Sequence, residues 1–182
     1  MPKTKDRNRM ARERIVAALT ELMSERDYVS ITITEITQRA GVSRMTYYRN
    51  YSSKEDILRK FMTDVGEKIH AKIVAQDLYK DPYLYYLTLF ETLGQYAALV
   101  NAALNAGLDG LIRDCISRNM DLTYLGSDEY PGAQKYLLRY HAGAFFHVLI
   151  EWTRTGMVEP CEEMARLCAD ARNGKLGFPG LS

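Results

Sequence analysis

Apolar residues recur at spacings of three and four along most of the chain, which is the period of an amphipathic α-helix. Between Arg7 and Arg26, for example, Ala11, Ile15 and Leu19 lie on one stripe of a polar helix. No stretch of strand length alternates apolar and polar residues. The pattern therefore predicts an all-α protein, with an N-terminal three-helix helix-turn-helix domain followed by a helical bundle.

Capping signals place the predicted helices. Thr32 with Glu35 forms a capping box, Gly41 suits a left-handed helix end, and Ser43 can cap the next helix. Asp81-Pro82 begins a further helix, since proline is tolerated in a first turn. The predicted helices are 7–26, 33–40, 44–50, 54–75, 82–105, 111–120, 133–155 and 160–173.

Charge divides the chain into a basic head and an acidic body. Residues 1–60 hold 13 Lys and Arg against 8 Asp and Glu, whereas residues 61–182 hold 11 against 15. This asymmetry suggests that only the head meets a polyanion. We predict a DNA-binding domain at 1–60 and a ligand-binding and dimerisation domain at 61–182.

Residues 32–51 carry the candidate chemistry, because a short capped helix, a glycine turn and a second short helix form a helix-turn-helix. On the second helix Arg44 and Tyr48 share a face, as do Met45 and Arg49, and both pairs are expected to point outward. Arginine can read guanine, and the methyl groups of Thr46 and Met45 can contact thymine. Tyr48, Asn50 and Lys54 are placed to bind phosphates. The competing interpretation is an ordinary helical hairpin with solvated charges.

The same stretch resembles the N-terminal DNA-binding domain of the TetR family of transcriptional regulators. The resemblance covers about residues 8–62 and rests on Ile15 with Leu19-x-x-Leu22, Ile31-Thr32-Ile33-x-x-Ile36, Ala40-Gly41-Val42-Ser43, Thr46-x-Tyr48, Tyr51 and Lys54-x-x-Ile57-Leu58. Two residues depart from the usual family pattern, Tyr51 in place of Phe and Thr37 in place of Ala. The resemblance implies DNA contacts at Thr34, Arg44, Met45, Thr46, Tyr48, Asn50 and Lys54, and we add Ser43 and Arg49 of the same segment.

The second half resembles a C-terminal domain type common among TetR-like regulators of Gram-positive bacteria. The match rests on Glu151-Trp152-Thr153-x-x-Gly156-Met157 and Pro160-x-Glu162-Glu163-Met164-Ala165. Members of this type include relatives of activators of dihydroxyacetone kinase operons, whose signal arrives through a protein partner. The expected effector is therefore either a small molecule or a protein co-regulator.

Two sets of residues are candidates for effector binding and for dimer formation. Aromatic residues concentrated after residue 79 predict either a solid core or a phenol-lined pocket, with candidate pocket residues Phe61, Met62, Tyr86, Phe90, Tyr124, His141 and Phe145. The helix 133–155 is apolar on two sides and is expected to pack with 160–173 against a second subunit. The candidate dimer residues are Tyr140, Gly143, Ala144, His147, Val148, Glu151, Met164, Leu167 and Cys168.

The remaining features limit the alternatives. His147 and Glu151 are four residues apart without a third ligand, so we predict no metal site and no cofactor. The sequence lacks nucleotide-binding and hydrolase motifs, and an enzyme is only a remote alternative to a DNA-binding protein. Three unpaired cysteines, no apolar run of about 20 residues and no secretion signal predict a cytoplasmic protein without membrane contact. The overall expectation is a homodimeric regulator, more often a repressor than an activator, that binds a near-palindromic DNA operator.

Overall fold

The computed structural model describes residues 4–124, 132 and 134–176, and it confirms the all-α prediction. The described part of the chain consists of helices joined by turns and short irregular connections, and it contains no strand. None of the helices described combines the length and the hydropathy that crossing a bilayer requires. The fold is therefore built from helix packing alone.

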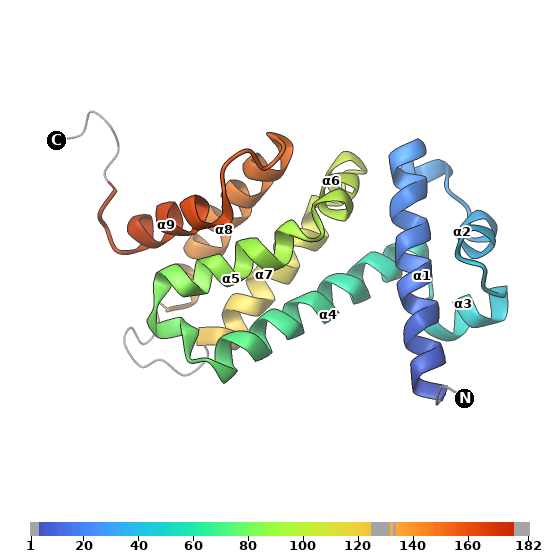
Figure 1. The fold of residues 1–182 in the computed structure, drawn as a ribbon, viewed down its shortest axis with the longest axis horizontal. Helices are drawn as coiled ribbons and strands as arrows, with labels where there is room; N and C mark the ends of the chain where they lie inside the picture. The colour runs from blue at the N-terminus through green and yellow to red at the C-terminus, as the bar shows by residue number, and fades with distance from the viewer. Residues whose placement is uncertain (1–3, 125–131, 133, 177–182) are drawn as a thin grey trace. The chain divides into compact units, whose positions relative to one another are not determined.

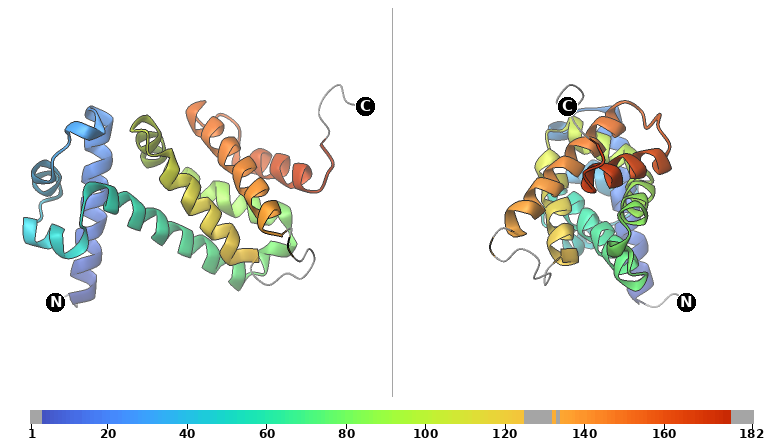
Figure 2. Two further views of the ribbon diagram at one scale, coloured as in Figure 1. Left: turned by 180° about the vertical axis from the view of Figure 1, so that it is seen from behind. Right: turned by 90° about the vertical axis from the view of Figure 1, so that its left-hand side faces the viewer.

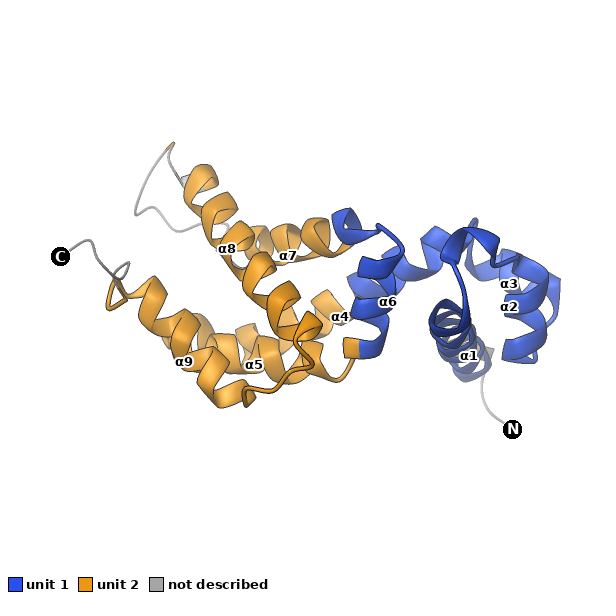
Figure 3. Ribbon diagram, turned by 90° about the horizontal axis from the view of Figure 1, so that it is seen from above, with its two compact units in different colours: residues 1–64, 98–111 blue, residues 65–97, 112–182 orange. Residues whose placement is uncertain are grey.

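The chain divides into two compact units (Figure 3). The first contains residues 1–64 and 98–111, and the second contains residues 65–97 and 112–182. Helix α4, Lys54–Ala75, contributes residues to both units. The division at residue 60 predicted from the sequence separates the chain by function, not by packing. That functional division stays a prediction.

The first unit contains the predicted helix-turn-helix. Helix α1, Thr4–Glu25, packs against α2, Ile33–Ala40, and against α3, Arg44–Asn50 (Figure 1). A 3₁₀ turn, η1 at Tyr28–Ser30, connects α1 to α2, and α6, Ala97–Asn105, also lies in this unit apart from its first residue. Its core consists of buried side chains from each of the first four helices, among them Ile15, Leu19, Leu22, Ile36, Tyr47, Ile57 and Leu58.

The second unit is a helical bundle with an aromatic core. After a 3₁₀ turn, η2 at Leu78–Lys80, it contains α5, Pro82–Gly94, α7, Asp109–Tyr124, α8, Gln134–Arg154, and α9, Cys161–Arg172. The first residues of α7 belong to the first unit. Helices α5 and α9 pack side by side (Figures 1 and 2).

The structure splits one helix that the sequence pattern predicted as continuous. The expected helix 82–105 ends at Gly94, and α6 begins at Ala97. A side chain at position 94 would place its Cβ 3.3 Å from the Trp152 ring, so this close approach favours glycine. Glycine has a low helix propensity, and the chain leaves the helix at this point.

Candidate nucleic-acid interface

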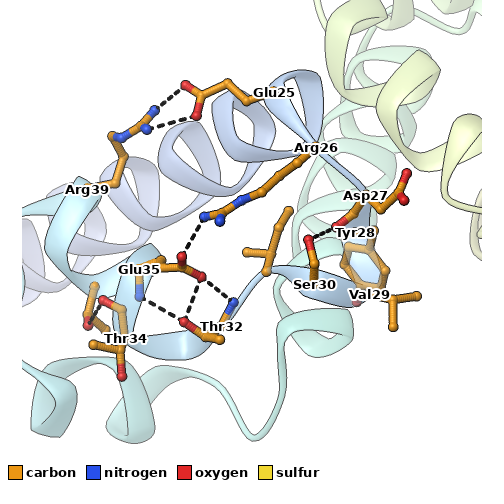
Figure 4. A network of polar contacts seen from close by, with 12 residues as sticks. Glu25, Arg26, Asp27, Tyr28, Val29, Ser30, Thr32, Thr34, Glu35 and Arg39 are labelled. Atoms are coloured by element: carbon orange, nitrogen blue, oxygen red, sulfur yellow. Dashed lines mark hydrogen bonds and ion pairs between the residues drawn. The ribbon is translucent and has the colours of Figure 1, made fainter.

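The start of α2 is fixed by the predicted capping box. The Thr32 amide donates to Glu35 Oε2 at 2.9 Å, and the Glu35 amide donates to Thr32 Oγ1 at 3.3 Å (Figure 4). The Arg26 guanidinium lies 2.8 Å from the same carboxylate. The hydrogen bonds from Thr32, followed by those from Arg26, lower the pKa of Glu35 to about 2. The cap is therefore fully charged at neutral pH.

The Arg39 side chain connects the C-terminal end of α2 to α1 through hydrogen bonds. Arg39 donates to Glu25 at 2.8 and 3.0 Å and to Glu21 at 3.2 Å (Figure 4 shows Glu25). Two parallel N–H···O bonds to one carboxylate impose a geometry as well as an attraction. The first helix of the helix-turn-helix is thus held to α1 by a polar contact at its C-terminal end.

The turn between α2 and α3 has the geometry that its glycine predicts. Gly41 adopts a φ of +62°, and the Val42 amide donates to Thr37 O at 3.0 Å. Thr37, which departs from the family pattern, is buried and satisfies its hydroxyl by donating to Thr34 O at 2.9 Å. Ser43 then caps α3, accepting from the Thr46 amide at 3.1 Å. The hydroxyl of Ser43 is therefore engaged in positioning α3.

Helix α3 exposes one face and buries the other. Tyr47 and Tyr51, which are four residues apart, are both fully buried, whereas Met45 is 80% and Tyr48 50% exposed. Arg44 and Arg49 are exposed, and Thr46 is half-buried. The outward face of α3 thus carries two guanidiniums, a thioether and a phenol over an aromatic core.

Two members of this face are aligned with each other. The Arg44 guanidinium donates to the Tyr48 hydroxyl at 3.4 Å and lies 6.0 Å from the centre of its ring. The ring of Tyr48 in turn packs edge-on against Tyr47, with centroids 5.3 Å apart. Buried Tyr47 therefore supports Tyr48, and Tyr48 restrains Arg44.

Two predicted phosphate contacts are engaged within the protein. The Lys54 ammonium donates to Val29 O at 3.0 Å, to Ile31 O at 2.9 Å and to Tyr28 O. An ammonium has three N–H groups, so these carbonyls of η1 and its C-cap use all of them. Asn50 is half-buried and donates from Nδ2 to Thr46 O at 2.8 Å. A phosphate contact from Lys54 would require these bonds to be exchanged, whereas Thr34 is exposed on α2.

We expect Lys54→Met to lower the free energy of unfolding by about 2 kcal/mol, because hydrogen bonds from a charged donor contribute about 1.5–3 kcal/mol. The substitution also removes the contact between the ammonium and the Tyr28 ring, whose centre lies 4.4 Å away. Urea unfolding followed by circular dichroism measures the change. Arg59→Met is the matched control, because the Arg59 guanidinium forms an exposed pair with Glu55 and its loss should cost at most about 0.5 kcal/mol. Equal losses in the two variants would contradict this role of Lys54.

The candidate pocket residues fall in both units. Met62 is buried and Phe61 half-buried in the first unit, and the side chain of Tyr124 lies outside the described part of the chain. In the second unit Phe145 contacts Tyr86 and Phe90, with centroids 5.8 and 5.4 Å apart. Phe90 also meets Trp152 at 5.2 Å, and His141 is half-buried. Burial, followed by the charge of Arg172, lowers the pKa of His141.

The candidate dimer residues divide by helix. On α8, Tyr140, Ala144, His147 and Glu151 are exposed, while Gly143 and Val148 are half-buried. On α9, Leu167 is exposed, but Met164 and Cys168 are buried within the protomer. The α9 part of the predicted surface therefore reduces to Leu167, because the buried side of this helix is already covered.

Two of the three thiols are held in their unreactive form, and no metal-binding cluster is found among the residues described. Burial raises the pKa of Cys168 to about 12 and that of Cys115 to about 11, so both remain protonated at neutral pH. A thiolate, the form that reacts with oxidants, is thus disfavoured at both positions. Within the described residues no three His, Cys, Asp or Glu side chains gather closely enough to hold a metal ion.

The fold and the exposed face of α3 define a helix-turn-helix protein. The N-terminal domain described as "Bacterial regulatory proteins, tetR family" matches residues 15–61. The chain therefore contains the N-terminal domain of the TetR family of bacterial regulatory proteins. A domain of regulatory proteins supports the expectation that the chain is not an enzyme.

Two curated relatives agree with this assignment over short segments. The uncharacterized HTH-type transcriptional regulator YxbF of Bacillus subtilis (strain 168) is 37% identical over 49 residues, or 26% of this chain and 13% of that protein. The HTH-type transcriptional regulator AlkX of Mycobacterium tuberculosis (strain ATCC 25618 / H37Rv) is 24% identical over 70 residues, 36% of this chain and 33% of that protein. The matches thus span at most a third of these relatives.

A solved structure resembles most of the chain. The dihydroxyacetone kinase operon activator DhaS aligns with a TM-score of 0.66 and 17% identity, over 91% of this chain and 95% of that chain. At this identity the likeness establishes the fold, including the helices beyond residue 61.

Proposed function

We propose that the protein is a cytoplasmic DNA-binding transcriptional regulator that binds a near-palindromic operator as a homodimer. The observation that carries the proposal is α3, whose outward face combines exposed Arg44, Met45, Tyr48 and Arg49 while its inner face is fixed by the buried Tyr47. A short helix of this kind fits the major groove of B-DNA. Two copies would lie on successive major grooves, ~34–36 Å apart.

The side chains of the helix-turn-helix divide into base readers and backbone contacts. We assign base contacts to Arg44, Met45 and Thr46, because arginine reads guanine and methyl groups contact thymine. Thr34, Ser43, Tyr48, Arg49 and Asn50 are assigned to the backbone, where hydroxyls, amides and guanidiniums bind phosphates. Lys54 would contact a phosphate only if its ammonium exchanged its hydrogen bonds to the carbonyls of Tyr28, Val29 and Ile31 for one to DNA.

Arg44→Ala is expected to reduce discrimination between the operator and mismatched sites by ~1–3 kcal/mol, since one bidentate base contact is worth about that much. Fluorescence anisotropy with an operator duplex selected from genomic fragments, and with the same duplex altered at one base pair at a time, measures the change. Arg59→Ala, an exposed arginine of α4, is the control and should retain discrimination. Retained discrimination in Arg44→Ala would contradict the assignment of α3 as the reader.

The second unit and its α8 surface are proposed to supply dimer contacts and the response to an effector. Helix α4 carries residues of both units, so a rearrangement of its later turns can change the spacing of the two readers. In this proposal residues 1–60 bind DNA, and residues 61–182 bind the effector and form the dimer. An effector that favours a different spacing of the two α3 helices would weaken operator binding, so a repressor would dissociate from the DNA.

A partner protein is the second candidate effector. The ring contacts among Tyr86, Phe90, Phe145 and Trp152 favour a packed core at this position over a small-molecule pocket. DhaS, which shares the fold, is named as an operon activator, and this supports activation as an alternative to repression. A thermal-shift screen with small molecules and a pull-down with the intact protein distinguish a small-molecule effector from a protein effector. A reporter gene downstream of the operator distinguishes activation from repression.

A further inference from the structure

Helix α1 begins well before the part of the chain that matches the family. It starts at Thr4, whereas the match starts at residue 15. Residues 1–14 contain six Lys and Arg against two acidic residues. The turns of α1 that precede residue 15 are therefore strongly basic.

The four arginines of these turns lie on different sides of α1. Arg12 pairs with Asp64 of α4, at 2.6 Å, and Arg9 lies 3.9 Å from Glu13 of the next turn. Arg7 and Arg14 are both exposed, and neither has an ion-pair partner among the residues that the structure describes. Two of the four guanidiniums are thus available to an anion.

Helical spacing shows which way these two arginines face. Residues seven apart share a face of a helix, so Arg7, Arg14 and Glu21 lie along one edge of α1. Glu21 at the end of that edge is bonded to Arg39 of α2. The edge that carries Arg7 and Arg14 is therefore the edge next to the helix-turn-helix. Arg12, by contrast, is directed to α4.

Helix α3 lies beside the N-terminal half of α1, while α2 lies nearer its C-terminal half (Figures 1 and 2). Arg7 and Arg14 thus belong to the half of α1 beside which α3 lies, and α3 carries the exposed Arg44 and Arg49. All four residues belong to the first unit, so this arrangement does not depend on the second.

We propose that Arg7 and Arg14 form a second DNA contact, which binds backbone phosphates flanking the major groove occupied by α3. The inference rests on the proposed function, and it deepens that function by extending the operator beyond the bases that α3 can reach. Guanidiniums bind phosphates without reading the base, so this contact adds affinity and salt dependence rather than sequence preference.

The test is the salt dependence of DNA binding by the Arg7→Ala/Arg14→Ala double variant of the full chain. Each phosphate contact contributes about 0.9 to the slope of log K against log salt, so the slope should fall by roughly 2 for each half-site. Affinity for an operator duplex of about 40 bp at about 100 mM salt should drop roughly tenfold or more. Base discrimination and the melting temperature should be unchanged, because both residues are exposed.

Arg9→Ala/Lys68→Ala is the matched control. It removes the same charge from exposed positions off this edge and should change the slope much less. A slope unchanged in Arg7→Ala/Arg14→Ala, or an equal loss in the control, would overturn the inference while leaving the reader intact. Failure of the unmodified protein to bind any duplex at low salt would instead overturn the proposed function.

Discussion

In the homodimer proposed above, Ala144→Glu is expected to separate the two copies at micromolar concentrations. Helix α8 exposes an apolar stripe in the protomer, in which Tyr136 and Tyr140 are 68% and 70% exposed and Leu137 is also exposed. Ala144 lies one turn further along this side, and a Cβ added to the neighbouring Gly143 would meet no atom within 4 Å. Small residues here would allow a second α8 to approach closely.

A carboxylate at position 144 would be buried twice in a two-fold interface, because each copy contributes the same surface. An unpaired buried charge costs several kcal/mol, so the dimer dissociation constant should rise by at least about a thousandfold. Sedimentation velocity over a concentration series measures this. Operator affinity should fall with it, since a monomer contacts only one half-site.

Ala71→Glu provides the control for this experiment. Ala71 is an exposed alanine of the second unit, on α4 rather than α8, and the same substitution there should leave the dimer intact. A dimer that persists in Ala144→Glu would show that α8 does not form the interface. Dissociation of both variants would indicate a general effect of charge.

The parts of the fold that the sequence predicts are those fixed by local chemistry. Thr32 with Glu35, Gly41 and Ser43 each act on backbone groups within four residues, so the pattern of residue types determines the boundaries of α2 and α3. The four-residue spacing of Tyr47 and Tyr51 likewise predicts their common buried side. These features define the candidate DNA-binding face before any tertiary contact is known.

The features that sequence reasoning missed depend on partners distant in the chain. Lys54 is directed to carbonyls more than twenty residues earlier, and no local signal indicates that its ammonium is engaged there. Gly94, at which α5 ends, lies against the ring of Trp152, and the burial of Cys168 depends on the packing of α9. Arg7 and Arg14 could be identified as basic, but the edge on which they lie became informative only through the bond between Glu21 and Arg39.

The second large effect concerns the aromatic cluster of the second unit. Phe90→Ala is expected to lower the free energy of unfolding by about 3–5 kcal/mol, because it leaves a cavity in a packed core. Phe90 is fully buried, and its ring contacts Phe145 and Trp152 at centroid distances of 5.4 and 5.2 Å. Removing the ring thus removes contacts with both α8 neighbours at once.

The measurement is urea unfolding at a fixed protomer concentration, since the proposed dimer would make stability depend on concentration. Trp152 is the sole tryptophan and adjoins Phe90, so its fluorescence reports on this site directly. Leu84→Ala on the same helix is the control, because Leu84 is 40% exposed and should cost less than about 1 kcal/mol. A loss in Phe90→Ala no larger than in the control would mean that the ring lines a space rather than fills a core. That result would favour a small-molecule effector over a partner protein, because an open aromatic space in the second unit is what such an effector needs.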